Sequence, residues 1–327
     1  MAKRREVVIE SGLKSRRFGT DELIDAASWA FMRELRTNNR TKRIYDIDPY
    51  AEVYQFRDNL YGIFSENIDG GGDVWEYLIV GPEKAMLIDT GYGIGNLKGL
   101  AELLSGGREL IVVNTHPHPD HALGNPQFDE IFCHEYAVPQ TEDYMRSGPS
   151  YDKLYGENGD FRYVEFDRAD LVPLRDYKIT GVKDGHIFNL GGDYEVELIF
   201  MGGHQVGHCA LLDRKNKTLF PGDNILSMRV AIKPRTGLYK EFGTVRTLRD
   251  NMLRLVERIE EFDGIFPGHF MVDVDSRVAV DMYEALDAIV KNPDSCDYTE
   301  YSESAGVLKF KFVKGFGVIR YQDGCVE

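Results

Sequence analysis

The chain has 327 residues and a formal net charge of −15. Apolar residues make up 43% of it and aromatic residues 12%, a composition that permits a sizeable core and excludes a disordered chain. The negative charge argues against a nucleic-acid partner, because affinity for nucleic acids depends largely on cations that neutralise phosphates. A chain of this length forms one large domain or two smaller ones.

The sequence lacks the features of export and of membrane insertion. No stretch approaches the ~20 apolar residues that cross a bilayer, and no apolar segment follows the basic residues at the N-terminus. The four cysteines have no C-x-x-C spacing, which favours free thiols in a reducing compartment. We therefore expect a cytoplasmic protein with no membrane partner. The cysteines are Cys133, Cys209, Cys296 and Cys325.

The first 43 residues are basic overall, unlike the rest of the chain. Within them, Asp21 to about Arg36 predicts a helix, because its apolar residues fall on one face. We interpret residues 1–50 as a basic, helical extension packed on the main body. This extension is either a solvated arm or a contact between the subunits of a homo-oligomer.

From about Glu52 the pattern becomes that of β-strands, in two groups that are each followed by helices. Residues 81–84, Gly-Pro-Glu-Lys, predict a hairpin turn within the first group. The last long strand before a cluster of histidines, Leu110–Asn114, runs directly into that cluster. Predicted strands of the first group lie at 53–64, 74–80, 85–89, 110–114 and 131–133, with helices at 97–104 and 136–145.

Residues 147–176 are rich in Tyr, Asp, Gly and Pro and show weak periodicity. They predict a long irregular segment, either a lid or a surface loop, and we expect a loop that borders the active-site pocket. Strand patterns then resume. Predicted strands of the second group lie at 177–182, 187–190, 194–200, 210–212, 218–220 and 265–266, with helices at 244–262 and 276–291 and a closing hairpin at 305–322.

The densest functional motif is Thr115-His116-Pro117-His118-Pro119-Asp120-His121. In an extended segment residues two apart project to the same side, so His116 and His118 can bind one ion together. The two prolines restrict the backbone and lower the entropy cost of ordering it around a metal. Asp120 and His121 lie where the chain turns toward a helix, which lets them face a second ion. Imidazole and carboxylate ligands suit zinc, and also iron or manganese.

Three further candidate ligands each follow a predicted strand and a glycine, namely His204, Asp223 and His269. Loops at one edge of a sheet can bring side chains from separate strands to one point, and glycine lets the backbone approach an ion closely. Together with the first motif they make seven candidate ligands. Without a metal, such a set would leave several polar groups uncompensated in one place.

Taken in order, these segments resemble the metallo-β-lactamase superfamily. An Asp that ends a strand before Thr-Gly, Asp89, matches an earlier motif of the family. The resemblance spans about residues 52–290 and is closest in motif to the glyoxalase II and lactonase branch. Asp223 stands where the lactamases proper use a softer ligand, and His118 stands where the flavodiiron branch has Glu. The matching motifs are H-x-H-x-D-H at His116–His121, G-H-x-x-G at Gly203–Gly207, F-x-G-D at Phe220–Asp223 and P-G-H at Pro267–His269.

The resemblance implies an α/β (α+β) fold, an αββα sandwich of two mixed β-sheets flanked by helices. Residues 51–327 would form the catalytic domain, with a core at about 52–290 and the C-terminal hairpin outside it. The family binds two divalent metal ions, so we expect two here, zinc first and iron or manganese as alternatives. One ion would be held by His116, His118 and His204, the other by Asp120, His121 and His269, with Asp223 bridging them.

Two residues beside the ligands take supporting roles by the same resemblance. Asp89 would order the loop of the first motif. His208 lies four residues after His204 and competes with it as a ligand. The family pattern favours His204 and leaves His208 a hydrogen-bonding role.

The leading hypothesis is an enzyme, a hydrolase that uses a metal-bridging hydroxide to cleave a small carboxylic ester, thioester or lactone. Asp120 is the candidate catalytic residue, because it can orient the nucleophile or accept its proton. The alternative is a phosphodiesterase or ribonuclease on the same dinuclear site, although the net charge disfavours RNA. A metal-binding or redox module without hydrolysis is a third hypothesis.

We expect the substrate to be a small molecule, and an anionic one, held by the loop after Asp223. In glyoxalase II-like enzymes a lysine of this loop helps to hold a substrate carboxylate, and Lys233 lies at a similar place. A solvated basic loop is the alternative explanation. The further candidates for substrate binding are Arg229, Arg235 and Tyr239.

Overall fold

The structure is a computed structural model that describes residues 6–9, 12–20, 36, 39–148 and 151–327. The chain divides into two compact, interleaved units. The predicted helix from Asp21 to Arg36 lies outside the described residues except for its last residue, and the boundary predicted near residue 50 stays a prediction. Unit 1 comprises Met1–Val113, His118–Ile131 and Glu142–Lys178, and unit 2 comprises Asn114–Pro117, Phe132–Thr141 and Ile179–Glu327.

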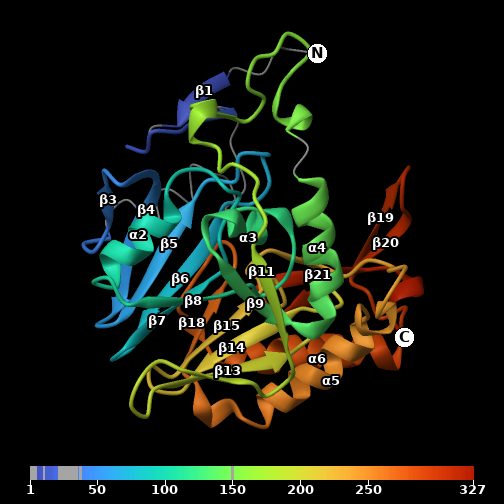
Figure 1. Cartoon of the computed structure of the whole chain (residues 1–327). Helices are drawn as coiled ribbons and strands as arrows, with labels where there is room; N and C mark the ends of the chain where they lie inside the picture. Colours follow the sequence, from blue (N-terminus) through green and yellow to red (C-terminus); the bar gives the residue numbers. More distant parts are fainter. Residues whose placement is uncertain (1–5, 10–11, 21–35, 37–38, 149–150) are drawn as a thin grey trace. The chain divides into compact units, whose positions relative to one another are not determined.

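Unit 1 is built on strands that form hairpins and end in a parallel pair. Its strands β3 to β8 belong to a sheet of order β11-β9-β8-β7-β6-β5-β4-β3, in which β9 and β11 fall mostly in unit 2. β4 to β8 are the blue-to-cyan arrows of Figure 1. β4 to β7 pair antiparallel in sequence order, and β7 pairs parallel with β8. Val80 lies opposite Ala85, which confirms the predicted turn at residues 81–84. The bounds are β3 Arg43–Tyr45, β4 Asp48–Arg57, β5 Leu60–Ser65, β6 Val74–Val80, β7 Lys84–Ile88, β8 Glu109–Val113, β9 Glu130–His134 and β11 Lys178–Val182.

Two central strands of unit 1, β6 and β7, are nearly continuous apolar runs, as expected where both faces of a sheet are covered. β6 and β7 are buried along almost their whole length. The predicted helix at 97–104 is confirmed as α2, Leu97–Leu104. Asn96 caps its start by accepting a hydrogen bond from the Gly99 amide, and its buried side includes Leu100 and Ala101.

A small three-stranded sheet in unit 1 was not predicted. It consists of β1 (Glu6–Ile9), β2 (Arg16–Thr20) and β10 (Val164–Glu165), all antiparallel. Residues 1–19 have no strand periodicity, and β2 pairs with a strand about 150 residues further along the chain. Pairing at that distance leaves no local pattern by which a sequence could reveal it.

Unit 2 contains a six-stranded sheet of order β12-β13-β14-β15-β17-β18. Its strands pair antiparallel except β15 and β17, which run parallel. A parallel pair places the ends of both strands at the same edge of the sheet, and this matters for the two residues that follow them, Asp223 and His269. The bounds are β12 Ile187–Asn189, β13 Glu195–Phe200, β14 Cys209–Asp213, β15 Thr218–Gly222, β17 Gly264–Pro267 and β18 Val274–Asp275.

Two amphipathic helices cover this sheet, α5 (Val245–Val256) and α6 (Arg277–Lys291), drawn side by side in orange in Figure 1. Their apolar faces share one core with β13 to β15. Thr244 caps α5 by accepting a hydrogen bond from the Thr247 amide. The helix predicted at 244–262 is too long, since α5 ends at Val256 and only a 3-10 turn follows at Ile259–Glu261.

The C-terminal residues of unit 2 form a four-stranded sheet of order β16-β21-β20-β19. The predicted closing hairpin is confirmed, because β20 and β21 pair antiparallel. β16 and β19 were not predicted. The bounds are β16 Arg229–Ala231, β19 Tyr298–Ser302, β20 Gly306–Val313 and β21 Gly317–Tyr321, and the helix predicted near 136–145 is α4, Val138–Ser147.

The observed fold class is therefore mixed α+β, with several mixed sheets and few helices, as predicted. In the part of the chain that the structure describes, no helix is both long and apolar enough to span a membrane.

Candidate metal centre

The first histidine motif lies between the end of β8 and the short helix α3, Pro119–Ala122. His118 is extended, with φ −66° and ψ 150°, and Pro119 starts the helix, where its fixed φ suits the first position. This turn sends His116 and His118 out of the extended segment and Asp120 and His121 out of the helix. His116 and His121 are completely buried.

The second candidate segment of unit 1 is the end of β7. Asp89 has a φ of 62°, which is uncommon for a residue other than glycine. Its amide donates to the Val113 carbonyl at 2.9 Å, and its Oδ2 lies 2.8 Å from Nδ1 of His121. The unusual backbone conformation therefore brings a carboxylate against the ring of a candidate ligand.

In unit 2, His204 follows β13 through two glycines with positive φ, Gly202 at 62° and Gly203 at 75°. A Cβ on Gly203 would lie 2.6 Å from Cβ of Leu248, so the loop requires glycine there. Asn224 ties this loop to the next one: its Oδ1 accepts from the His204 amide at 3.2 Å. Asp223 and His269 follow the parallel strands β15 and β17, as their places in the sheet require.

Asp223 lies at the centre of three imidazoles. Its Oδ2 is 3.9 Å from Nε2 of His116 and 3.5 Å from Nε2 of His204. Its other oxygen, Oδ1, is 3.4 Å from Nε2 of His269. The two carboxylate oxygens thus face different histidines, which is the arrangement expected of a ligand shared by two ions.

The predicted ligands come together in two groups. Within each group, one ligand atom from every member lies within 4.8 Å of those of the others. The motif order divides the same residues in the same way, and their coordination of metal ions stays a prediction. The groups are His116, His118, His204 and Asp223, and Asp120, His121 and His269.

The ring orientations suit metal binding. Three histidines hold Nδ1 against a neighbouring group and turn Nε2 toward a carboxylate of the cluster, a pattern typical of metal ligands. The partners of Nδ1 are Thr115 Oγ1 for His116 at 3.0 Å, Asp89 for His121 at 2.8 Å and the Ala231 carbonyl for His204 at 2.8 Å. Imidazole and carboxylate donors of this kind fit zinc, iron or manganese.

A model of the Metallo-beta-lactamase superfamily matches residues 69–294, well over half of the chain. The chain belongs to the metallo-beta-lactamase superfamily. This confirms the predicted family, while the narrower likeness to the glyoxalase II and lactonase branch stays a prediction.

Among sequence relatives of this superfamily member, human acyl-coenzyme A thioesterase MBLAC2 is 25% identical over 238 residues, covering 65% of the chain and 78% of that protein. The Bos taurus acyl-coenzyme A thioesterase MBLAC2 is 27% identical over 241 residues, with the same coverage. Among solved structures, a metallo-beta-lactamase from Pontibacter korlensis has a TM-score of 0.50, 18% identity, and covers 72% of the chain and 99% of its own. DIM-1 metallo-beta-lactamase has a TM-score of 0.51, 16% identity, and coverages of 73% and 98%. The solved structures support the fold alone.

His208, the competing candidate, belongs to neither ligand group of this metallo-beta-lactamase fold. It is buried, its ring stacks on that of His116 at 4.6 Å, and its Nε2 accepts a hydrogen bond from the Asp223 amide at 3.1 Å. Nε2 of His208 is therefore engaged by a backbone donor. The geometry favours His204 as the ligand and a supporting role for His208.

The predicted substrate-binding residues fall into two kinds. Arg229 and Lys233 are exposed on β16 and just beyond it. Arg235 is partly buried and donates to the carbonyl of His204, so it supports the ligand loop. Tyr239 has a φ of 61°, and its ring packs on Tyr136 at 4.5 Å between centroids. Arg235 and Tyr239 thus make contacts within the protein, whereas Arg229 and Lys233 are exposed, and contact of any of the four with a substrate stays a prediction.

The sequence analysis missed a third cation, Arg320 on β21. Arg320 lies opposite Ala231 of β16 in the parallel pairing, which brings it beside Arg229 and Lys233. Partial desolvation, together with the charges of Arg320, Arg235 and Arg229, lowers the pKa of Lys233. Alternation of apolar and polar residues along β21 was visible in the sequence, but its parallel pairing with β16 was not.

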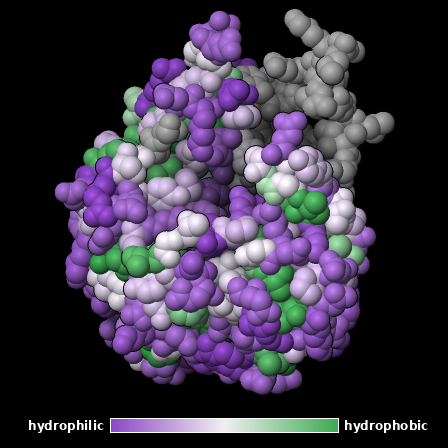
Figure 2. Space-filling model, turned by 90° about the vertical axis from the view of Figure 1, so that its right-hand side faces the viewer, coloured by the Kyte–Doolittle hydropathy of each residue, from purple (hydrophilic) through white to green (hydrophobic). Residues whose placement is uncertain are grey.

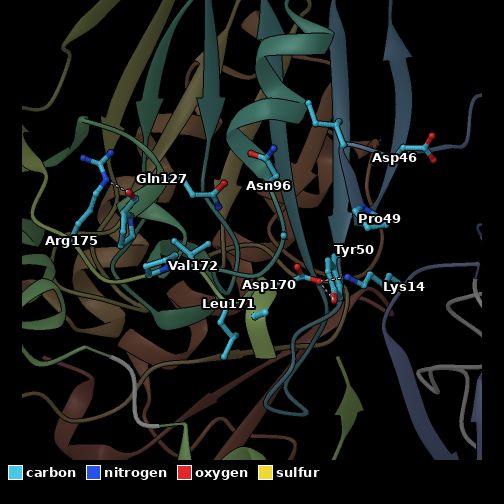
Figure 3. A pocket seen from close by; sticks show the side chains of 15 residues that line it. Lys14, Asp46, Pro49, Tyr50, Asn96, Gln127, Asp170, Leu171, Val172 and Arg175 are labelled. Carbon is cyan, nitrogen blue, oxygen red and sulfur yellow. Dashed lines mark hydrogen bonds and ion pairs between the residues drawn. The ribbon is translucent and has the colours of Figure 1, made fainter. Parts of the chain in front are cut away.

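A separate cavity of about 670 Å³ lies in unit 1 and contains none of the candidate ligands. Figure 3 shows Lys14, Tyr50 and Asp170 together at one end and Arg175 at the other. Three of its charged residues are paired: Lys14 and Tyr50 donate to Asp170, and Arg175 forms an ion pair with Asp129 at 3.0 Å. The irregular segment 147–176 contributes a wall to this cavity, while its predicted place beside the active site stays a prediction.

Proposed function

We propose that this protein is a metal-dependent hydrolase of thioesters and that its substrates are coenzyme A thioesters. The observation that carries the proposal is the pair of ligand groups, together with Asp223, whose Oδ2 faces His116 and His204 and whose Oδ1 faces His269. The sequence predicts a carboxylic ester, a thioester or a lactone as the substrate. The relatives reported above are acyl-coenzyme A thioesterases, and they favour the thioester among these three.

The residues present fit two divalent ions, zinc first. His116, His118 and His204 would hold one, Asp120, His121 and His269 the other, and Asp223 both. Bound divalent ions supply Lewis acidity, which lowers the pKa of water toward 7 and polarises a carbonyl oxygen. A shared carboxylate would offset the repulsion between two cations held this close.

The protein side chains supply proton transfer and orientation. Asp120 is partly exposed, with a side-chain exposure of 20%, and Asn67 Nδ2 donates to its Oδ2 at 3.4 Å. We assign Asp120 as the group that accepts the proton of the attacking water. As the carbon–sulfur bond breaks, the sulfur leaves as a thiolate, which is stable near neutral pH and needs little help from a general acid.

The anionic part of the substrate is assigned to the exposed cations beside the site. In a protein of net charge −15, a cluster of cations is an attractive local field for an anion. Lys233 and Arg229 are the sequence-predicted members of this cluster, and a coenzyme A thioester carries several negative charges. A small neutral ester gains nothing from them.

The experiment is a metal analysis joined to a substrate panel. Purified protein loaded with zinc and desalted is tested on acyl-coenzyme A, a lactone, a β-lactam and a phosphodiester. We expect two metals per chain and turnover of the thioester that is lost with chelator and in His116→Ala. The matched control, His186→Ala, changes an exposed histidine away from both ligand groups. Turnover of the phosphodiester without any thioester would replace this function with the phosphodiesterase alternative.

We also propose the cytoplasm as the location, because the four cysteines are free thiols, and three of them, Cys133, Cys209 and Cys325, are buried. A homo-oligomer formed through the N-terminal extension stays a prediction, and gel filtration of the full chain tests it.

A further inference from the structure

The four-stranded C-terminal sheet has two faces of opposite character. Successive side chains of a strand point to opposite faces, and residues paired directly across strands share a face. Val230 and Ile319, which pair across β16 and β21, are buried in the core of unit 2. The residues on either side of them, Arg229 with Val318 and Ala231 with Arg320, therefore belong to the opposite face.

This outer face combines aromatic rings with cations. Phe310 lies opposite Arg320 and Phe312 opposite Val318 in the β20–β21 hairpin. Tyr298 of β19 stacks on Phe310, with centroids 4.5 Å apart and ring planes within 4°. The row of strands thus runs from an aromatic side at β19 and β20 to a cationic side at β21 and β16.

The aromatic part of the face is hollowed. A cavity of about 550 Å³ lies over it, and its lining includes Arg229 and Glu300. Phe312 is 56% exposed and Tyr298 38% exposed, which is unusual for large apolar side chains without a ligand or partner. β19 and β20 lie at the right of Figure 1, so Figure 2 views this side, on which hydrophobic residues form separate patches within a mainly hydrophilic surface. The aromatic lining residues are Phe270, Tyr298, Phe310, Phe312 and Phe316.

The cations on this face lack partners. Within the described part of the chain, the side chains of Arg229, Lys233 and Arg320 make no hydrogen bond or ion pair, whereas most other cations of this acidic protein do. Partial desolvation and the charge of Arg229 also lower the pKa of Arg320. Cations held together against their mutual repulsion form a site that an anion would stabilise.

Within unit 2, this face is linked to the loops that carry His204 and His269. The Ala231 carbonyl, on the strand that begins with Arg229, lies 2.8 Å from Nδ1 of His204. Phe270, a wall of the cavity, directly follows His269 in the sequence. The amide of Met271 donates to Ser227 Oγ at 3.2 Å, which ties the two lining segments together. A ligand on this face would therefore reach the ligand loops of His204 and His269.

We propose that the outer face of the C-terminal sheet binds the nucleotide part of a coenzyme A thioester, with its phosphates on Arg229, Lys233 and Arg320 and its adenine ring in the aromatic cavity. The proposal rests on the proposed thioesterase function. Arginine forms paired hydrogen bonds with phosphate oxygens, and aromatic rings stack on bases. The pantetheine arm would join this subsite to the thioester at the metal centre. The Arg229 and Glu300 walls disfavour a plain hydrocarbon chain, because burying charges against it is costly.

The first test measures binding without turnover. Coenzyme A and adenosine 3′,5′-bisphosphate are titrated calorimetrically into the zinc-loaded full chain. Arg320→Ala and Phe312→Ser should each weaken both ligands by about tenfold or more, as expected for loss of a charge-assisted contact or a stacking surface. Lys314→Ala removes a cation of the same hairpin that pairs with Asp281 and Glu284, and it should leave both affinities unchanged. Arg320→Lys, with intact thermal unfolding, checks that a loss does not reflect misfolding.

The second test compares two substrates with the same acyl group, acyl-coenzyme A and acyl-pantetheine, which lacks the nucleotide. Arg320→Ala should raise KM for acyl-coenzyme A and leave KM for acyl-pantetheine unchanged. If both are hydrolysed but their KM values change equally or not at all, the subsite is wrong and the thioesterase function stands. If neither is hydrolysed, the function fails, and the titration still decides whether the face binds the nucleotide. A Phe312→Ser effect that grows with acyl-chain length, with unchanged affinity for coenzyme A, would place the acyl chain in the cavity and overturn the inference.

Discussion

Asp89 Oδ2 lies 2.8 Å from Nδ1 of His121, and neither side chain is more than 1% exposed. The contact fixes the ring of His121 so that Nε2 faces Asp120, 3.8 Å from its Oδ2. Because both groups are buried, no water can replace the carboxylate if it is removed. The orientation of a candidate ligand in unit 1 therefore depends on one residue outside the ligand set.

Replacing Asp89 by Asn should lower affinity for zinc by about 10–100-fold, because a neutral amide orients and polarises the imidazole less well than a carboxylate. Competition with a chromophoric chelator measures the affinity. Asp129→Asn, which changes an exposed carboxylate paired only with Arg175 on the surface, serves as the control. Equal zinc affinities for Asp89→Asn and the wild type would remove the proposed role of Asp89.

His204 and His208 should differ sharply when each is changed to Ala. His204→Ala removes a proposed ligand, so we expect fewer than two zinc ions per chain and almost no turnover. His208→Ala removes a ring that stacks on His116 and accepts from the Asp223 amide, so both metals should remain and turnover should fall less. Elemental analysis after desalting decides, and the opposite order of metal loss would exchange the two roles.

Asp223→Ala should release at least one metal and abolish hydrolysis, since both of its oxygens face candidate ligands. Asp223→Asn keeps the shape but removes the charge that offsets cation repulsion, and it should show an intermediate loss of metal. Metal content and turnover are measured on the same preparations. Retention of both metals and near-normal turnover in Asp223→Ala would contradict the bridging assignment.

His134 should make the protein sensitive to acid. Burial lowers the pKa of His134 to about 4, from 6.5, so the unfolded chain binds a proton between these values and the folded chain does not. The contribution of His134 to the free energy of unfolding is therefore fully present above pH 6.5 and is lost as the pH falls toward 4. His134→Asn keeps an acceptor for the Tyr136 amide without a titrating ring. Urea unfolding of the metal-free protein measures the free energy of unfolding at pH 7.5 and at pH 5. The decrease between these two pH values should be smaller in His134→Asn than in the wild type, by on the order of 2 kcal/mol.

Gly317→Ala should weaken the C-terminal sheet. A Cβ at this position would lie 2.4 Å from the Leu226 carbonyl oxygen and 2.8 Å from that of Met228, and backbone atoms cannot move aside cheaply. We expect a loss of about 1–3 kcal/mol in the free energy of unfolding, typical of overpacking. Gly324→Ala, whose Cβ would meet only Pro234 at 3.8 Å, should be nearly neutral. Equal stability of the two variants would show that Gly317 does not approach the Leu226 and Met228 carbonyls this closely.

The sequence alone specified the family, most strands and helices, and the seven candidate ligands. These features leave local traces: His116 to His121 lie in one motif, and His204, Asp223 and His269 each follow a strand and a glycine. Helix bounds were partly predictable for the same reason. α2 has the predicted bounds because a cap and a glycine pair flank it, whereas α5 ends earlier than its apolar periodicity suggested.

Only the tertiary structure decided how these residues face one another. The family resemblance favoured His204 over His208 as a ligand, and the structure adds that Nε2 of His208 accepts a hydrogen bond from the Asp223 amide. The sequence offered Tyr239 and Arg235 as substrate contacts. The structure adds that Tyr239 packs on Tyr136 and that Arg235 donates to the His204 carbonyl, and contact with a substrate stays a prediction. Arg320 joins Arg229 and Lys233 because β21 pairs in parallel with β16, about 90 residues earlier in the chain. Register between distant strands is set by the packing of the whole sheet, so no local pattern could have revealed it.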